Sequence, residues 1–287
     1  MEVESGAGRA SSRLLNRLVG IAKRVTPDST HPALRYYRFR ARAFRISLAD
    51  RFTRVGGDLP LPPPRLRYRV HGGLDAQTYI DVGKHCADDL AQAARLAGRE
   101  MSSFHHILDF GCGSARVLRH FRDLPASSDV RGTDIDPEAI RWCRKAIPFA
   151  TFEVNDARPP LPFPDSTFDL IYAVSVFTHL DEELQAAWLA DLRRVAAPGA
   201  VLLLTTHGTY AQAELPEDYK RRLAEDGFAF HKVATGRFKL DGLPDFYQNA
   251  YHSKTYVQRN WSRYFDVRHH LERGLNDHQD LVVLLKP

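Results

Sequence analysis

The chain has 287 residues, of which 44% are hydrophobic and 26% are charged. These values are typical of a soluble globular protein and exclude collagen-like, disordered and disulfide-stapled classes. The formal net charge of +5 is too small to indicate a nucleic-acid partner, although it permits an acidic substrate or an anionic membrane surface. The three cysteines, Cys86, Cys112 and Cys143, form no CxxC pair, so we expect a reducing, cytoplasmic location.

The first 64 residues precede the regular part of the chain and divide into stretches of different character. Residues 1–12 lack aromatic side chains and periodicity, so we predict a disordered tail. Apolar residues then recur at helical spacing over Arg13–Val25, which predicts a short basic helix rather than an export signal. Arg35–Phe52 interleaves arginines with aromatic residues, and the Pro/Gly-rich stretch Gly56–Pro64 ends this basic, helical N-terminal extension of residues 13–64.

The arginine and aromatic pattern of Arg35–Phe52 has two interpretations. Arginine stems pack beside aromatic rings on the outside of ordinary helices, which is a purely structural role. The same pattern is typical of a surface that binds lipid headgroups, a phosphorylated substrate or RNA. Docking on a membrane surface therefore stays open as a hypothesis, although no apolar run approaches the ~18 residues that a membrane-spanning helix needs.

From His106 onward, short apolar runs alternate with longer amphipathic segments. The runs HILDF, DVRGTD, TFEVN, FDLIYAV and AVLLLTT predict strands, and helices are expected over Ala76–Leu96 and from Ser114, Pro137 and Glu182. The final runs, YFDVRHHL and DLVVLLKP, are too close together for a crossover helix and predict an antiparallel pair at a sheet edge. The pattern indicates an α/β fold with a doubly wound, Rossmann-like, seven-stranded sheet whose last strand is antiparallel.

A glycine-containing turn follows the first of these strands. The segment Ile107–Arg116 contains Asp109, Gly111, Cys112 and Gly113, and it leads from a buried strand into a predicted helix. Glycines let a backbone approach a ligand closely, and a helix N-terminus offers free N–H groups. The third glycine of the dinucleotide fingerprint is absent, which argues against a pyrophosphate ligand.

Acidic residues stand at the ends of the next two strands. Asp134 closes the second strand and can accept hydrogen bonds from both hydroxyls of a ribose, whereas Asp136, just before Pro137, is the better helix cap. Asp156 closes the third strand and could accept from an adenine amino group. Since open α/β sheets bind ligands at the carboxyl ends of their strands, these positions predict a nucleoside site without a phosphate.

On these motifs, Tyr79–Pro287 resembles the class I S-adenosylmethionine-dependent methyltransferases. The VFTHL segment and the terminal strands are similar to those of bacterial enzymes that act on glycans and other small molecules. The resemblance implies S-adenosyl-L-methionine as cofactor and a methyltransferase domain over residues 65–287. It also implies cofactor contacts from the first strand and its turn, the ends of the second and third strands, and the exit of the fourth: Asp109, Gly111, Cys112, Gly113, Asp134, Ile135, Asp156, Ala157 and Ser175.

Histidines near the expected methyl group are candidates for a general base. His179 follows the fourth strand and is the first choice, while His207 and His252 are alternatives; His179 could instead only anchor its loop. Metal-dependent relatives carry carboxylates where this chain has Ser175 and Thr205-Thr206-His207, so we expect no metal of that type. The fourth-strand exit AVSVF also lacks the motif of DNA amino-methylating enzymes, so DNA is not an expected partner.

An insertion over residues 207–252 separates the fifth strand from a helix expected near Ser253. Long loops at the carboxyl edge of a sheet shape substrate pockets, so we predict that this insertion and the N-terminal helices form a lid. We expect a short hairpin within GFAFHKVATGRFKL and four aromatic substrate contacts, Tyr210, Phe246, Tyr247 and Tyr251. A packing elaboration or a dimer contact is the alternative.

The leading hypothesis is an O-methyltransferase that acts on a hydroxyl of a small polar metabolite, a sugar or a glycan. One alternative is a methyltransferase that reaches a lipid or secondary metabolite at a membrane surface through the basic N-terminal helices. Another is a cofactor-binding or RNA-associated subunit without its own chemistry. The sequence leaves the acceptor atom and the oligomeric state open.

Overall fold

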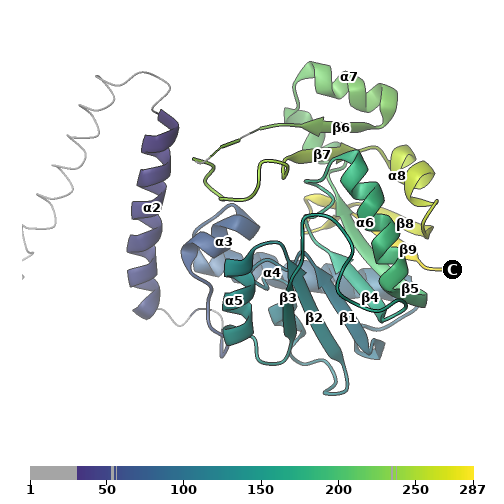
Figure 1. The fold of residues 1–287 in the computed structure, drawn as a ribbon, viewed down its shortest axis with the longest axis horizontal. Helices are drawn as coiled ribbons and strands as arrows, with labels where there is room; N and C mark the ends of the chain where they lie inside the picture. The colour runs from purple at the N-terminus through teal and green to yellow at the C-terminus, as the bar shows by residue number, and fades with distance from the viewer. Residues whose placement is uncertain (1–30, 53–54, 56, 234, 237) are drawn as a thin grey trace, which may run out of the picture.

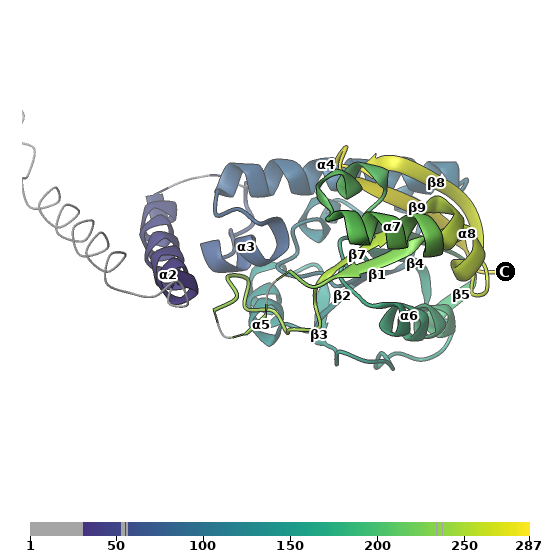
Figure 2. The same cartoon turned by 90° about the horizontal axis from the view of Figure 1, so that it is seen from above.

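A computed structural model describes residues 31–52, 55, 57–233, 235–236 and 238–287. The predicted tail over residues 1–12 and the predicted basic helix Arg13–Val25 lie outside the described residues. Within the described part, a mixed sheet carries helices on both of its faces (Figures 1 and 2).

The central sheet has seven strands in the order β3-β2-β1-β4-β5-β9-β8. Strands β1 to β5 are parallel, and β9 runs antiparallel to both of its neighbours, β5 and β8. This arrangement confirms the predicted Rossmann-like sheet with a reversed last strand. The bounds are β1 His106–Phe110, β2 Asp129–Asp134, β3 Thr151–Val154, β4 Phe168–Ala173, β5 Ala196–Thr206, β8 Asp266–Leu275 and β9 Gln279–Leu285.

Buried strands explain the continuous apolar runs, because both faces of the sheet are covered. Neighbouring residues such as Ile107 and Leu108 point to opposite faces and enter two separate cores. One core packs against α4, Ala76–Leu96, and the other against α6, Glu182–Val195, and α8, Lys254–Trp261. Figure 2 shows α4 and α6 on opposite sides of the strands.

Helix starts follow the capping residues in the sequence. Asp75, Asp136, Asp181 and Ser253 cap α4, α5, α6 and α8, each accepting a hydrogen bond from a backbone N–H in the first turn. Helix α5 spans Pro137–Ala146. The chain also forms short 3₁₀ turns: η2 Asp50–Phe52, η3 Met101–Ser103 and η4 Leu118–Phe121.

The helix expected from Ser114 is wrong, since only η4 forms after the glycine turn. Gly113 and Ala115 both adopt left-handed backbone conformations, with φ of 52° and 56°. Such residues interrupt a right-handed helix at the position where it was expected to begin. Residues 113–117 instead form turns before η4 begins.

The insertion after β5 folds as η5 Thr209–Glu214, α7 Glu217–Asp226 and β6 Phe228–His231 before it returns as β7 Asn249–His252. The predicted hairpin within GFAFHKVATGRFKL is wrong, because β6 pairs antiparallel with β7 rather than with the residues that follow it. In the loop between β6 and β7, side chains near its end accept hydrogen bonds from backbone N–H groups near its start. Gln248 Oε1 accepts from Val233 N, and Asp245 Oδ1 accepts from Gly236 N.

Within the described ranges, two helices come before α4 in the chain: α2 His31–Ala49 and α3 Pro64–His71, of which α3 was not predicted. Pro64 at the first position and Gly72 at the left-handed C-cap bound α3. The proline-rich stretch before it is held to the body of the fold, because the buried Arg119 donates to the carbonyls of Leu59 and Pro60. No helix in the described ranges is both long and apolar enough to cross a bilayer.

Candidate functional site

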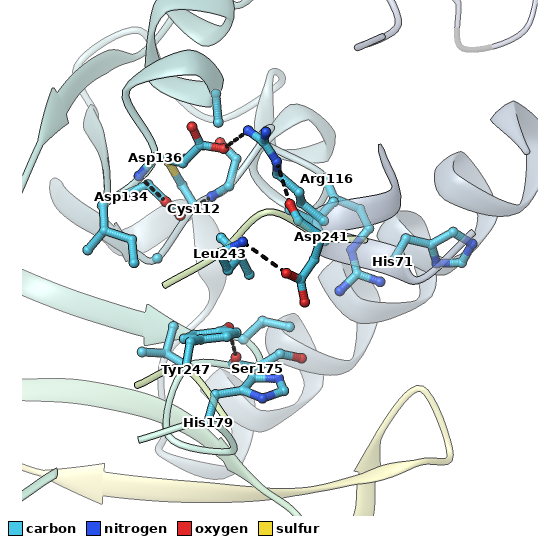
Figure 3. A pocket seen from close by; sticks show the side chains of 18 of the residues that line it. His71, Cys112, Arg116, Asp134, Asp136, Ser175, His179, Asp241, Leu243 and Tyr247 are labelled. Atoms are coloured by element: carbon cyan, nitrogen blue, oxygen red, sulfur yellow. Dashed lines mark hydrogen bonds and ion pairs between the residues drawn. The ribbon is translucent and has the colours of Figure 1, made fainter. Parts of the chain in front are cut away.

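A cavity of about 650 Å³ opens at the carboxyl ends of β1, β2, β3 and β4. Helix α3, the start of α4, the loop between β6 and β7, and the turn between β8 and β9 complete its walls. This volume lies within the range of small-molecule sites. Figure 3 shows side chains from the strand ends and from the β6–β7 loop facing one another across it.

The glycine turn after β1 is hydrogen-bonded to the neighbouring strand β2. Gly111 N and Cys112 N donate to the carbonyl of Thr133 at 2.8 and 2.9 Å. Gly111 has φ of 78°, and a Cβ there would lie 2.3 Å from Val176 Cγ2. Only glycine meets both constraints, so the turn keeps its backbone exposed to the cavity. Burial raises the pKa of the Cys112 thiol well above its ordinary value, which fits a packing role rather than a nucleophile.

Asp134 lies at the end of β2 and lines the cavity beside this turn. Its two oxygens accept hydrogen bonds from Gly113 N at 2.7 Å and from Asp136 N at 2.8 Å. Burial raises the pKa of Asp134 to about 6. Since each carboxylate oxygen can accept more than one hydrogen bond, the oriented side chain keeps acceptor sites for a pair of hydroxyls.

A second carboxyl group, Asp109, is buried at the end of β1 and lines the same cavity. Burial raises the pKa of Asp109 to about 8, and the charge of Asp134 adds to this rise. Asp109 is therefore mostly protonated at neutral pH in the ligand-free protein. A cationic ligand beside it would favour the ionised form.

The end of β3 differs from expectation. Ala157 lines the cavity, as does Ile135 after β2, but Asp156 is exposed and lies outside the lining. Its neighbour Asn155 is buried and lines the cavity instead, because successive residues of an extended segment point to opposite sides. Asn155 Oδ1 has no hydrogen-bond partner within the described part of the chain.

His179 is the predicted base that the structure places in the cavity lining. Its Nδ1 lies 2.6 Å from the carbonyl oxygen of Gln248. Because a carbonyl only accepts, Nδ1 carries the proton and the lone pair is on Nε2. The Asn249 side chain also lies within hydrogen-bond reach of the ring. Burial lowers the pKa of His179 to about 4, so the ring is neutral at pH 7.

Tyr247 fixes the plane of the His179 ring. The two rings stack with centroids 4.3 Å apart and an interplanar angle of 24°. The Tyr247 hydroxyl donates to the carbonyl of Ser175 at 2.8 Å, as Figure 3 shows. Ser175, with φ of 60°, follows β4, and its Oγ accepts from Gln279 Nε2 at 2.8 Å. The fourth-strand exit, the loop between β6 and β7 and the last strand therefore meet at one point.

The structure does not bring the other two candidate bases to the cavity. His207 lies behind His179, with ring centroids 5.8 Å apart, and its Nδ1 donates to the carbonyl of Ala250. His252 is buried beside Gln185, whose Oε1 lies 2.9 Å from His252 Nε2. Neither histidine belongs to the cavity lining. Burial lowers the pKa of each to about 3.

The predicted aromatic contacts also divide into two pairs. Phe246 and Tyr247 line the cavity. Tyr210 is exposed beneath the Arg273 guanidinium, and Tyr251 is buried against His207, both outside the lining. The insertion therefore contributes to the site through the loop between β6 and β7, while its first half packs elsewhere.

Two basic residues that the sequence patterns did not reveal hold the loop between β6 and β7. Arg69 of α3 donates from Nε to the Asp241 carbonyl at 2.8 Å and pairs with the carboxylates of Asp136 and Glu138. Lys239 is buried, and its Nζ donates to the carbonyls of Pro244 and Tyr247, both at 3.0 Å. No local pattern marks such contacts, because Arg69 and Asp241 stand 172 residues apart.

Comparisons with known proteins agree with this geometry. Residues 107–199 match the model of a family described as a methyltransferase domain. The chain is 29% identical over 151 residues to 2-methyl-6-phytyl-1,4-hydroquinone methyltransferase of Synechocystis sp., covering 45% of each chain. It is 28% identical over 148 residues to malonyl-[acyl-carrier protein] O-methyltransferase of Salmonella typhimurium, covering 49% of this chain and 51% of that one.

These matches span about half the length of the curated relatives. Among solved structures, the PH0226 protein of Pyrococcus horikoshii superimposes with a TM-score of 0.50 at 20% identity. That superposition covers 77% of this chain and 98% of the other, and it supports the sheet topology described above.

Proposed function

Because the chain carries a class I S-adenosylmethionine-dependent methyltransferase domain, we propose that it transfers a methyl group to a hydroxyl oxygen of a small polar acceptor, such as a metabolite, a sugar or a glycan. The observation that carries this proposal is that one cavity holds both the Asp134 and glycine-turn arrangement and the neutral ring of His179. The malonyl-[acyl-carrier protein] relative, named as an O-methyltransferase, supports oxygen as the acceptor atom.

The residues present fit S-adenosylmethionine. Asp134 has the oriented carboxylate that ribose hydroxyls need, and Gly111 exposes its backbone beside it. Asn155 Oδ1 is a buried acceptor without a partner among the described residues, which suits the amino group of an adenine. Asp109 supplies a carboxyl group that can ionise next to a cation. We assign the adenine contact to Asn155 in place of Asp156.

When bound, S-adenosylmethionine supplies a methyl group already activated by its sulfonium. The protein then needs mainly to align the acceptor, and such positioning can contribute roughly 7–11 kcal/mol. A hydroxyl also has to lose its proton as its oxygen gains the methyl group. His179 can take that proton at Nε2, because Nδ1 is held by Gln248 and the ring is neutral at working pH.

The rest of the cavity favours a polar acceptor. Asn249 lines it from β7, Asn276 from the turn between β8 and β9, and Gln279 from the first position of β9. Gln279 Oε1 has no partner in the described part of the chain. Amide side chains can donate to and accept from hydroxyl groups without a net charge. Phe246 and Tyr247 add an apolar wall on the lid side.

The test is transfer of a labelled methyl group from S-adenosylmethionine to acceptors in a metabolite extract. We expect His179→Ala to lower kcat by about 10²–10⁴-fold for a hydroxyl acceptor while the affinity for S-adenosylhomocysteine stays close to that of the parent. His269→Ala is the matched control, because His269 is exposed on β8 and lies outside the cavity lining. Full activity in a His179→Ala, His207→Ala double variant would refute the assignment of a histidine base.

The same assay separates this proposal from a subunit without its own chemistry. Such a subunit would bind S-adenosylhomocysteine in a calorimeter and transfer no label to any acceptor pool. Transfer to an amine or thiol acceptor that survives His179→Ala would keep the methyltransferase activity and remove oxygen as the acceptor atom.

A further inference from the structure

Helix α2 presents an outer face that nothing in the described part of the chain covers. Tyr37, Ala41, Phe44 and Leu48 recur at intervals of four, three and four residues, which places them on one stripe of a helix. Tyr37, Phe44 and Leu48 are 64%, 65% and 43% exposed. Apolar side chains in a continuous exposed stripe indicate a surface with a partner rather than scattered surface residues.

The inner face of the same helix is already used. Ala43 is buried, the Phe39 ring lies 4.6 Å from that of Tyr68 in α3, and the Tyr36 ring lies 6.0 Å from that of Phe238 in the lid loop. Figures 1 and 2 both place α2 on the side of α3 that faces away from the sheet. Within the described part of the chain, the helix is thus anchored by one face, and its other face is uncovered.

Positive charge borders the exposed stripe. Arg38, Arg42 and Arg45 are exposed and form a row immediately beside it, since each follows a stripe residue by one position. Two more arginines, Arg35 and Arg40, bring the helix to five arginines with no acidic residue. An apolar stripe flanked by arginine is the pattern of a helix that lies in the interface of an anionic bilayer.

From this geometry we propose that the outer face of α2 docks on the surface of a membrane that contains anionic lipid. The charge argues against the other occupants. A second copy of the chain in symmetric contact would set arginine against arginine. Residues 13–25 of the sequence contain arginines and a lysine but no acidic residue, so they would meet the same repulsion.

The composition of the stripe also favours lipid over a nucleic acid. Leu48 and Ala41 offer no ring on which a base could stack, whereas leucine and aromatic side chains both enter the acyl and headgroup boundary favourably. Because the inner face of α2 packs on Tyr68, which lines the cavity, docking would hold the cavity close to the lipid surface.

The experiment is co-sedimentation of the full chain with vesicles at low ionic strength. Vesicles of phosphatidylcholine with phosphatidylserine are compared with vesicles of phosphatidylcholine alone. We expect binding to the anionic vesicles only, weakened by added salt. The triple variant Arg38→Gln, Arg42→Gln, Arg45→Gln should lower the partition coefficient on the order of 100-fold, and Phe44→Ser should lower it about tenfold or more.

A matched control removes the same charge elsewhere. The control is the triple variant Arg221→Gln, Arg259→Gln, Arg263→Gln, which changes one exposed arginine in α7, one in α8 and one just after α8. This variant should bind vesicles like the parent. Binding of S-adenosylhomocysteine and the thermal midpoint of unfolding show whether each variant is folded. Because vesicle binding is measured directly, the test does not require the methyl acceptor to be known.

Several outcomes would overturn the proposal. The proposal is wrong if the α2 triple variant and the control triple variant bind anionic vesicles with the same partition coefficient. It is also wrong if the parent binds neutral and anionic vesicles equally. A dimer in sedimentation that Phe44→Ser dissociates would assign the stripe to a second copy. Loss of RNA binding in the α2 triple variant without loss of vesicle binding would assign the face to a nucleic acid.

Discussion

Asp109 shows how burial sets the charge of a single side chain at the site. It lies at the end of β1 with 3% of its surface exposed, and its pKa of about 8 keeps it mostly protonated at neutral pH. The sulfonium and ammonium groups of S-adenosylmethionine would stabilise the ionised form. By linkage, a ligand that prefers the ionised form binds more tightly as the pH rises toward the pKa of the free protein.

We therefore predict that the affinity for S-adenosylmethionine rises between pH 6 and pH 8, by up to about tenfold per pH unit. Asp109→Asn should remove this part of the dependence, because the amide does not titrate. Calorimetry at several pH values measures the dissociation constant for both proteins. Titration of the ligand itself affects parent and variant alike, so the difference between their pH profiles reports on Asp109. Methylthioadenosine, which lacks the sulfonium and the amino acid, is the control ligand. Equal pH profiles for parent and variant would contradict the role of Asp109.

At the scale of elements, the conformation of the loop between β6 and β7 depends on a few charged side chains. The loop between β6 and β7 is tied to α3 by Arg69 and is held in shape by Lys239, whose ammonium group satisfies two carbonyls of the loop. Leaving buried carbonyls without donors costs about 1–3 kcal/mol each. The conformation of the loop, and with it the position of Tyr247 and His179, is therefore sensitive to Lys239.

We predict that Lys239→Met makes the loop over residues 232–248 more sensitive to limited proteolysis and raises the KM for the acceptor. The methionine keeps the length of the side chain but donates no hydrogen bond to Pro244 or Tyr247. Lys232→Met is the matched control, since Lys232 is exposed in the same loop. Cleavage of Lys239→Met at the parent rate would show that the Lys239 contacts do not hold the loop.

At the scale of the whole molecule, three neutral histidines join the sheet to the insertion. His179, His207 and His252 have pKa values lowered by burial to about 4, 3 and 3. A group whose pKa is lower in the folded than in the unfolded state contributes stability above its unfolded value of 6.5, and that stability is lost as the pH falls toward the folded value. Asp109 and Asp134 titrate with the opposite sign, so single variants isolate the histidine effect.

We predict that the parent loses about 2 kcal/mol more stability than His252→Gln when the pH falls from 7 to 5. Urea unfolding at both pH values gives the difference. His252 lies outside the cavity lining, so its substitution tests stability apart from ligand binding. His269→Gln, at an exposed position, should follow the parent. An identical loss in parent and His252→Gln would mean that His252 does not titrate between these states.

Much of the fold follows from local sequence features. Apolar runs of strand length alternate with capped amphipathic helices, such as those begun by Asp75, Asp136 and Asp181. This alternation predicts a doubly wound parallel sheet, because right-handed crossovers leave few topologies. The prediction of a helix from Ser114 was wrong because Ala115 adopts a left-handed backbone conformation. The residue type alone does not indicate that conformation.

By itself, the sequence determined the strand-end part of the candidate site. The predicted cofactor contacts Asp109, Gly111, Gly113 and Asp134 all line one cavity, because the carboxyl ends of parallel strands meet at one edge whatever the surrounding loops do.

Only the tertiary structure decided what closes the site. It selected Asn155 over Asp156, brought His179 rather than His207 or His252 to the cavity, and placed α3 and Lys239 around it. The physical reason is that these choices depend on contacts between segments far apart in the chain. Such contacts decide which polar groups are buried with partners, and no periodicity or spacing in the sequence records them.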